Sequence, residues 1–363
     1  MTIGGILFWL IAIPATLLIL GLLVVVHEFG HFITARLVGI RVLEFGIGFP
    51  PRAKVIGHDH ETEYTINYLP IGGFVRLEGE ETDSDDPRAF GNSSLAKQLV
   101  VLVAGVTMNV ITAFLLFFVV AWAFNPVVQP KVVTVISGSP AEVAGIQPGD
   151  AFTSVDGRTY SLIDLGGDPW SGFMDYLASK AGQPVTLGLT DAAGHERTVS
   201  VTLRVPDKEH DYALGVQFGF GIAYTRGSFG PALSTAATST GKAMTLVLSA
   251  LGDLGRHIVT NPTTGPPGVS GPVGIAAVVG HTLFDWGPIL LLLLAAVISA
   301  NLALLNILPI PPFDGGKMVI MVVKRAFRIQ DVTSLESAIY LAGFVLLLAF
   351  MAWISYFDIL GLG

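Results

Sequence analysis

Four long apolar stretches dominate this sequence, and each is long enough to cross a lipid bilayer as a helix, which takes about 20 apolar residues. The composition agrees, because 52% of the residues are hydrophobic and only 13% are charged, against roughly a quarter charged in soluble domains. We therefore expect a polytopic α-helical membrane protein with about four transmembrane helices. The expected spans are residues 3–26, 98–124, 286–308 and 337–357.

The positions of Lys and Arg predict how these spans are oriented. Basic residues gather in the two short connections, between the first and second spans and between the third and fourth, and such connections stay in the cytoplasm. The region from about 125 to 285 and both termini are then expected outside. The net charge of −8 argues against a nucleic-acid partner. The residues concerned are Arg36, Arg41, Arg52, Lys54, Arg76, Arg88 and Lys97, then Lys317, Lys324, Arg325 and Arg328.

The segments between the spans carry signals of other structures. Residues 42–55 and 62–79 alternate partly between apolar and polar side chains, which predicts a β-hairpin or small sheet apolar enough to associate with the membrane. Residues 78–94 are acidic and polar, which indicates a solvated cytoplasmic loop. Within 126–225, a helix-like run at 171–179 and strand-like runs predict a small α+β domain. The strand-like runs are 131–137, 153–158, 183–191 and 197–205.

These patterns divide the chain into four parts. A helix expected around 231–254 has an apolar core too short to span a bilayer, so it belongs to an amphipathic linker. The expected parts are a first membrane half (1–125), an extracytoplasmic α+β domain (126–225), the linker (226–285) and a second membrane half (286–363).

The motif His-Glu-Phe-Gly-His at 27–31 follows the first apolar stretch. On a helix, His27 and His31 project from the same face and can share one metal ion. Glu28 lies beside them and can take a proton from an attacking water as a general base. Because the chain has no cysteine, every metal ligand must be His, Asp or Glu. The motif therefore indicates a metal-dependent hydrolytic site.

A third ligand must come from elsewhere, because a catalytic zinc typically has three protein ligands and one open position. Asp314 is the candidate, since it ends the run NILPIPPFD in the third span and is followed by two glycines. The prolines break the helix and the glycines permit close backbone contact, and ionisable groups within membranes are usually functional. The predicted orientation puts His27, His31 and Asp314 at the same cytoplasmic side.

Three asparagines lie in the apolar spans. Asn306, at the break before Asp314, is expected to hold a substrate backbone or to stabilise the oxyanion. Asn301 either contacts substrate or bonds between helices, as Asn commonly does in membranes. Asn109 is interpreted as a helix-packing residue beside Ala104 and Gly105.

Together these motifs resemble the site-2 protease family of intramembrane metalloproteases. The family pairs HExxH with Asn-x-x-Pro-x-Pro-x-x-Asp-Gly, and the hairpin runs GIGFPP and YLPIGGFVRL and the run GPVGIA are also similar to its bacterial regulator-of-sigma-E-protease-like branch. GIQPGDAFTSVDG resembles a circularly permuted bacterial PDZ domain. The best-known members of the branch carry two PDZ domains, whereas this chain has room for one. The second motif is matched by Asn306, Pro309, Pro311, Asp314 and Gly315.

The resemblance implies that His27, His31 and Asp314 bind Zn2+, that Glu28 is the general base and that Asn306 contacts substrate. The implied function is an intramembrane zinc metalloendopeptidase of the bacterial cytoplasmic membrane. Its partners would be the lipid bilayer and single-pass transmembrane proteins such as anti-sigma factors or signal-peptide remnants. The PDZ-like domain would bind a peptide end or exclude substrates with large outer domains. The alternative is a non-enzymatic PDZ-bearing membrane scaffold or metal carrier, which would lack the base or the third ligand.

A transmembrane substrate helix must unwind locally before its carbonyls can be attacked. An edge strand of the apolar hairpin, around 45–49 or 71–75, would pair with the unwound segment. Gly46, Gly48, Gly72 and Gly73 would let the substrate backbone come close. The other reading of these four glycines is that they mark bulges and turns of the hairpin.

Overall fold

The computed structural model describes residues 3–80, 82, 84–165, 167–261, 263–329 and 333–361. The chain divides into two compact units. One comprises Met1–Leu116 with Ala243–Gly363, and the other is Phe117–Lys242. The expected domain 126–225 falls inside the second unit.

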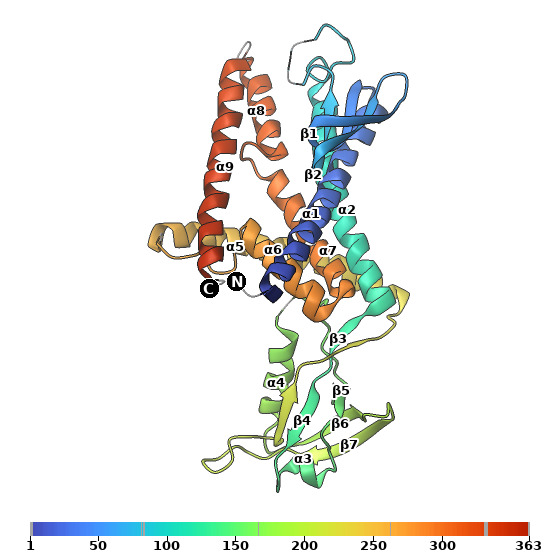
Figure 1. Cartoon of the computed structure of the whole chain (residues 1–363), viewed down its shortest axis with the longest axis vertical. Coiled ribbons are helices and arrows are strands. Elements are labelled where there is room, and N and C mark those ends of the chain that lie inside the picture. The colour runs from blue at the N-terminus through green and yellow to red at the C-terminus, as the bar shows by residue number, and fades with distance from the viewer. Residues whose placement is uncertain are drawn as a thin grey trace. The chain divides into compact units, whose positions relative to one another are not determined.

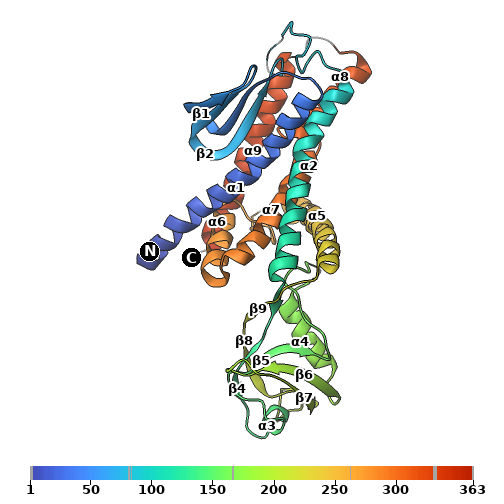
Figure 2. The same cartoon turned by 90° about the vertical axis from the view of Figure 1, so that its right-hand side faces the viewer.

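Four helices among the described residues are long and apolar enough to cross a membrane. The helices are seen in Figure 1, and Figure 2 shows that α1 and α2 lie close together at their upper ends and diverge below. The protein is therefore a multi-pass membrane protein, as the sequence predicts. The helices are α1 (Ile3–Leu37), α2 (Leu95–Val119, continued by the π-helical turn η1, Val120–Phe124), α7 (Pro288–Ile307) and α9 (Thr333–Gly361).

The first helix is longer than the expected span of 3–26, since α1 continues to Leu37. Residues 27–37 contain no proline, so nothing interrupts the backbone hydrogen bonding until Gly39. Gly39 has φ +83°, and the N–H of Ile40 closes the helix on the carbonyl of Ala35 at 2.8 Å, a common way for helices to end. The HEFGH motif therefore lies inside a continuous helix rather than at its end.

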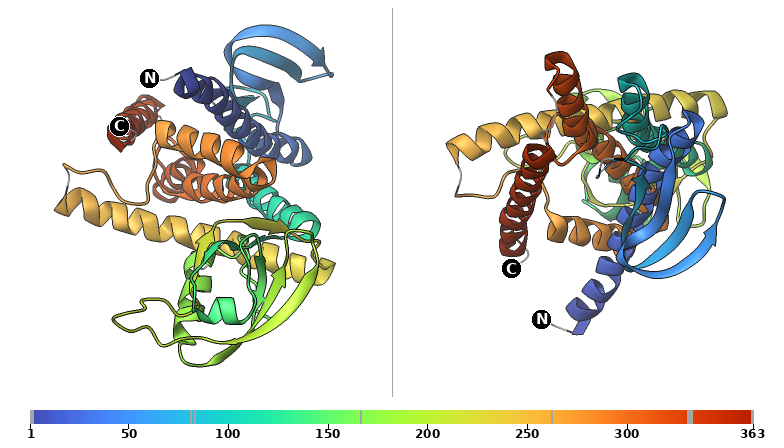
Figure 3. Two further views of the ribbon diagram at one scale, coloured as in Figure 1. Left: turned by 60° about the horizontal axis from the view of Figure 1, so that its bottom comes forward. Right: turned by 90° about the horizontal axis from the view of Figure 1, so that it is seen from above.

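The predicted hairpin is confirmed as β1 (Val42–His58) and β2 (Glu63–Leu77), which fold over one another (Figure 3). Residues 44–47 of β1 lie opposite 63–66 on one side and opposite 73–76 on the other. The alternative of an edge strand at 45–49 is therefore wrong, because the backbone of Phe45 to Ile47 is paired on both sides. The end of β2, residues 73–77, is an outer strand of this sheet.

The outer strand of β2 packs against α1. A Cβ on Gly72 would lie 2.9 Å from Cγ1 of Val24, and one on Gly73 would lie 3.1 Å from Cγ2 of Val25. Only glycine leaves room for β2 to approach the helix this closely. The strand thus runs along the part of α1 that leads into the HEFGH motif.

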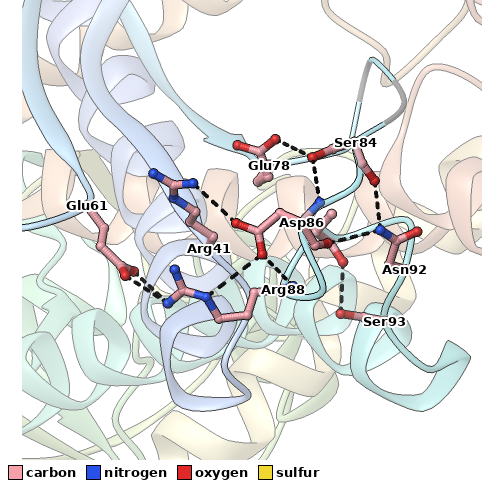
Figure 4. A network of polar contacts seen from close by, with 9 residues as sticks. Arg41, Glu61, Glu78, Ser84, Asp86, Arg88, Asn92 and Ser93 are labelled. Carbon is pink, nitrogen blue, oxygen red and sulfur yellow. Dashed lines mark hydrogen bonds and ion pairs between the residues drawn. The ribbon is translucent and has the colours of Figure 1, made fainter.

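The acidic segment 78–94 is a largely exposed loop, as expected, and polar contacts anchor it to the rest of the unit (Figure 4). Asp86 accepts a hydrogen bond from Arg41 at 3.2 Å, and Arg88 bonds Glu61 at 3.0 Å. Phe90 is buried in a core shared by the end of α1, the sheet and the start of α2. An internal network of Glu78, Ser84, Asn92 and Ser93 completes the fold of the segment.

The remaining helices of this unit surround the ends of the spans. Asp358 of α9 accepts hydrogen bonds from the N–H groups of Gly274 at 2.8 Å and Gly271 at 3.3 Å. These two bonds satisfy backbone donors at the start of α6, where the run GPVGIA lies. The elements are α5 (Phe229–Thr260, shared between the units and not among the four candidate spans), α6 (Pro272–His281), the π-helical turn η2 (Thr282–Trp286) and α8 (Asp314–Phe327).

The second unit contains a five-stranded antiparallel sheet in the order β7-β6-β5-β4-β8, and a short pair of β3 with β9. Phe173 and Leu177 of α4 share one buried core with Phe152, Leu187 and Leu189 of the sheet. The predicted strands and the helix near 171–179 are confirmed, and β3, β8 and β9 were not predicted. The elements are β3 (Pro126–Val128), β4 (Lys131–Val135), α3 (Pro140–Val143), β5 (Ala151–Val155), α4 (Pro169–Ser179), β6 (Pro184–Thr190), β7 (Glu196–Thr202), β8 (Val216–Gly219) and β9 (Ile222–Tyr224).

Candidate metal centre

His27 and His31 of α1 meet Asp314, the first residue of α8, although 283 residues or more separate them in the chain. Nε2 of His27 lies 3.0 Å from Oδ2 of Asp314 and 3.1 Å from Nε2 of His31. Nε2 of His31 lies 3.3 Å from the same Oδ2. All three side chains are buried. The structure therefore brings together the three metal ligands that the sequence predicts.

The three atoms suit a tetrahedral zinc ion. With zinc bonds of about 2.0–2.2 Å, neighbouring ligand atoms of a tetrahedron lie about 3.3–3.6 Å apart. The observed separations of 3.0, 3.1 and 3.3 Å reach this within a few tenths of an ångström. Two imidazoles and one carboxylate are also a donor set typical of catalytic zinc.

The remaining nitrogen of His31 has a partner that orients the ring. Nδ1 of His31 lies 2.8 Å from the backbone carbonyl of Val101 in α2. A carbonyl only accepts, so the proton sits on Nδ1 and leaves the lone pair of Nε2 free for a metal. Val101 is fully buried in the core that joins α1, α2 and the sheet, which fixes this carbonyl in place.

Glu28 lies next to this cluster. A carboxylate oxygen of Glu28 and one ring nitrogen from each of His27 and His31 lie within 4.8 Å of one another. Its Oε2 accepts a hydrogen bond from the backbone N–H of Val75 in β2 at 3.2 Å. The carboxylate is therefore held between the metal ligands and the outer strand of the sheet.

Gly105 of α2 is required at this site because it faces both histidine rings. A Cβ there would lie 2.7 Å from Cε1 of His27 and would overlap the ring of His31. From the sequence alone, Gly105 is interpreted only as a neighbour of the helix-packing residue Asn109. The signal that could have found it is its place four residues before Asn109, which also contacts the site.

Asn109 is a second residue whose contact was missed. Its side-chain amide lies 3.2 Å from Nδ1 of His27, and the residue is completely buried. The hydroxyl of Ser299 in α7 donates to the backbone carbonyl of Asn109 at 2.8 Å. Asn109 thus connects α2 both to a predicted metal ligand and to the third span.

The break between α7 and α8 aims Asp314 at the histidines. The helix α7 ends at Ile307, and the N–H of Phe313 returns to the carbonyl of Ile310 at 3.0 Å. A Cβ on Gly315 would overlap the carbonyls of Ile307 and Leu308. The glycine after Asp314 therefore lets α8 begin directly against the end of α7, as the sequence predicts.

Lys317 lies one turn after Asp314 and ties α8 to the anchored loop. Its Nζ lies 2.9 Å from Oε1 of Glu80. Burial lowers the pKa of the Lys317 ammonium, but the charge and hydrogen bond of Glu80, together with the charges of Asp314 and Glu28, outweigh burial and raise that pKa above its usual range. Lys317 therefore stays charged and holds the start of α8 against the loop that follows β2.

The remaining predicted site residues in α7 are Asn306 and Asn301. Asn306 is half-buried near the end of α7, and the described residues offer its side chain no hydrogen-bond partner. Oδ1 of Asn301 is buried and likewise without a partner in the part of the chain that the structure describes. Contacts to substrate remain predictions for both.

The four glycines of the hairpin have explanations within the chain. Gly48 and Gly72 adopt positive φ of 82° and 74°, where L side chains are strained. A Cβ on Gly46 would overlap the ring of Phe74, and Gly73 packs on the carbonyl of Gly46. These contacts favour the reading as bends and close approaches, and the role in substrate binding stays a prediction.

Apolar spanning helices around a buried His, His and Asp cluster with an adjacent Glu define the protein as a membrane metalloprotease. Comparison with known proteins agrees, since residues 15–350 match peptidase family M50. The chain belongs to this family, the site-2 proteases. A protein of Clostridium acetobutylicum, named "Putative zinc metalloprotease", is 32% identical to this chain over 348 residues. The aligned region covers 96% of this chain and 97% of the relative. A protein of the same name from Synechocystis sp. is 32% identical over 369 residues, which cover 97% of this chain and 95% of the relative. Another from Clostridium perfringens is 31% identical over 345 residues, which cover 95% of this chain and 97% of the relative.

Proposed function

We propose that this protein is an intramembrane zinc metalloendopeptidase that cleaves transmembrane segments of single-pass membrane proteins. Zn2+ is its cofactor, and we assign the zinc ligands as His27, His31 and Asp314 and the general base as Glu28. The observation that carries the proposal is the meeting of Nε2 of His27, Nε2 of His31 and Oδ2 of Asp314 within 3.3 Å, with Glu28 beside them. This cluster lies on a helix whose sequence is apolar enough to span the membrane.

Zinc, when bound, supplies a Lewis acid that acidifies water and polarises the scissile carbonyl. Glu28 takes the proton from the attacking water and later delivers a proton to the leaving amine, as one carboxylate can do in turn. The N–H of Val75 on Oε2 keeps the Glu28 carboxylate in one orientation while Oε1 exchanges the proton. Asn306 steadies the extended substrate chain near the end of α7.

The substrate is presented as an extended segment along the outer strand of β2. Residues 73–76 pair with β1 on one side only, and the N–H of Val75 points away from β1, toward Glu28. A segment that adds to this edge therefore has its backbone next to the general base. Of the two edges considered from the sequence, the one at 71–75 contains residues that pair with β1 on one side only, whereas Phe45 to Ile47 are paired on both sides.

We place the protein in the bacterial cytoplasmic membrane with the site near the cytoplasmic side. This orientation rests on the Lys and Arg residues of the connections 38–97 and 308–334. We further propose that the second unit contains an extracytoplasmic PDZ-like domain. It either binds a peptide end of the substrate or excludes substrates with large outer domains.

A non-enzymatic scaffold or metal carrier is the weaker alternative. It needs neither a general base nor a water-activating site, yet Glu28 lies within 4.8 Å of both histidines. Membership of a peptidase family favours the enzyme as well.

The test compares purified wild type with Glu28→Gln and His27→Ala in liposomes. We expect wild type and Glu28→Gln to bind one zinc each and only wild type to cleave a synthetic transmembrane peptide. His27→Ala should lose both zinc and cleavage. Equal cleavage by wild type and Glu28→Gln would contradict the mechanism, and a wild type without zinc would contradict the metal assignment.

Substrate class is tested separately with two families of peptides. One carries the transmembrane segment of an anti-sigma factor and the other a signal-peptide remnant, each with and without a folded outer domain. Cleavage that disappears when the outer domain is added supports size exclusion. Cleavage that depends on the sequence of the peptide end supports peptide binding by the PDZ-like domain.

A further inference from the structure

Asn109 has a buried amide oxygen that its surroundings leave unsatisfied. The residue is fully buried in α2, and Oδ1 has no hydrogen-bond partner among the described residues. Its Nδ2 instead lies 3.2 Å from Nδ1 of His27. A buried polar atom without a partner costs about 1–3 kcal/mol, so this arrangement calls for an explanation.

Rotating the amide by 180° exchanges its oxygen and nitrogen without moving any other atom, and the two ends are distinguished only by their hydrogen bonds. With Oδ1 toward His27, the ring donates its Nδ1–H to the amide oxygen, and the amide nitrogen takes the buried position that Oδ1 holds in the other orientation. The lone pair of Nε2 in His27 then faces Nε2 of His31 and Oδ2 of Asp314. In the opposite orientation the amide donates to Nδ1, and the proton of a neutral ring sits on Nε2, between the metal ligands.

His31 shows the same arrangement with a different acceptor. Its Nδ1 lies 2.8 Å from the carbonyl of Val101, eight residues before Asn109 on α2. One helix thus supplies an oxygen acceptor to each of the two rings, one from its backbone and one from a side chain. Such oxygen partners on the outer nitrogen are the rule for histidines that bind metals.

We propose that Asn109 is a positioning residue for His27, whose amide oxygen accepts Nδ1–H and holds the ring in the tautomer that presents Nε2 to zinc. The inference rests on the proposed zinc ligands. It replaces the interpretation of Asn109 as a packing residue alone. The contact of its backbone with Ser299 explains how the amide is held, since that bond fixes this turn of α2 against α7.

The test measures the zinc dissociation constant of the full-length protein by chelator competition. Asn109→Leu has nearly the same size and no acceptor, and loss of such a partner should weaken zinc binding about 10–100-fold. Asn109→Asp keeps an oxygen acceptor and should bind zinc at least as tightly as wild type. Thr107→Val removes only an exposed hydroxyl of the same helix, which bonds the carbonyl of Val103, and should bind zinc like wild type. Asn109→Ala replaces the leucine variant if that variant does not fold, as judged by thermal unfolding of the metal-free protein.

Two results would overturn the inference: wild-type zinc affinity in Asn109→Leu, or equal loss in Asn109→Asp and Asn109→Leu. His27→Ala separates this failure from failure of the proposed function. If His27→Ala loses zinc while Asn109→Leu does not, only the role of Asn109 is wrong. If His27→Ala keeps wild-type affinity, the metal site itself lies elsewhere and both proposals fail.

Discussion

The backbone N–H of Val75 donates a hydrogen bond to Oε2 of Glu28 at 3.2 Å. Val75 belongs to the outer strand of the sheet, whereas Glu28 lies between two histidines on α1. The bond joins the strand that we propose for substrate pairing to the proposed general base. The position of the carboxylate therefore depends on the position of that strand.

Val75→Pro removes this N–H, and an outward-facing N–H on an edge strand is a position where proline is tolerated. A hydrogen bond to a charged group contributes about 1.5–3 kcal/mol, so we expect cleavage to fall about tenfold to a hundredfold with zinc still bound. Val75→Ala keeps the N–H and is the control, with cleavage close to wild type. Equal cleavage by the two variants, measured with a transmembrane peptide, would show that the bond has no role.

Gly105→Ala should disrupt the metal centre, because its Cβ would lie 2.7 Å from Cε1 of His27. Added bulk in a packed site costs about 1–3 kcal/mol, and a zinc affinity weaker by about fivefold to a hundredfold is expected from that range. Gly252→Ala in α5 is the control, since a Cβ there meets nothing within 4 Å. It should bind zinc normally. Wild-type zinc affinity in Gly105→Ala would mean that the two rings lie farther from α2 than described.

The turn between β1 and β2 depends on a charged Asp59. Its Oδ1 accepts from the N–H groups of Glu61 at 3.0 Å and Thr62 at 2.8 Å, and its Oδ2 accepts from Arg36 at 2.6 Å. These hydrogen bonds hold the pKa of the Asp59 carboxyl well below its usual range. A carboxyl with a lowered pKa in the folded state stabilises that state above the ordinary pKa of about 3.9 and ceases to do so as the pH falls through the folded value.

Hydrogen exchange of residues 57–66 should therefore show protection that is constant from pH 7 to about pH 5 and declines as the pH is lowered further to about pH 3 in the wild type. Asp59→Asn has no charge to lose, so its protection should start lower and change less over the same interval. Protection factors corrected for the intrinsic pH dependence of exchange make the comparison. An equal decline in both proteins would assign the pH dependence to other groups.

Local patterns were sufficient for much of this fold and site. The four spans follow from runs of apolar residues, and the meeting of His31 with Asp314 follows from a helical spacing, a proline break and a charge-based orientation. The longer extent of α1 was missed because the span was judged by hydropathy. The helix ends where Gly39 allows a positive φ, not where the apolar residues end.

The contacts of α2 with the two histidines depend on which face of α2 meets α1. An apolar helix in lipid carries little sequence pattern that shows which face this is. Gly105 and Asn109 were therefore interpreted as packing residues. The anchoring of the acidic loop was missed for a related reason: Asp86 bonds Arg41 and Arg88 bonds Glu61, and both partners lie far from the loop in the sequence. The two candidate edge strands, 45–49 and 71–75, could likewise be told apart only once the pairing of β1 with both halves of β2 was known.

The central claim is that His27, His31 and Asp314 bind one zinc ion, and zinc K-edge X-ray absorption of the purified protein tests it most directly. We predict two imidazole nitrogens together with oxygen ligands, all at about 2.0–2.2 Å from zinc. Because the chain contains 8 histidines, the zinc content and the spectrum of His31→Ala are measured as well, and this variant should not give the two-imidazole spectrum. A wild-type spectrum without imidazole scattering, or an identical two-imidazole spectrum for His31→Ala, would contradict the account.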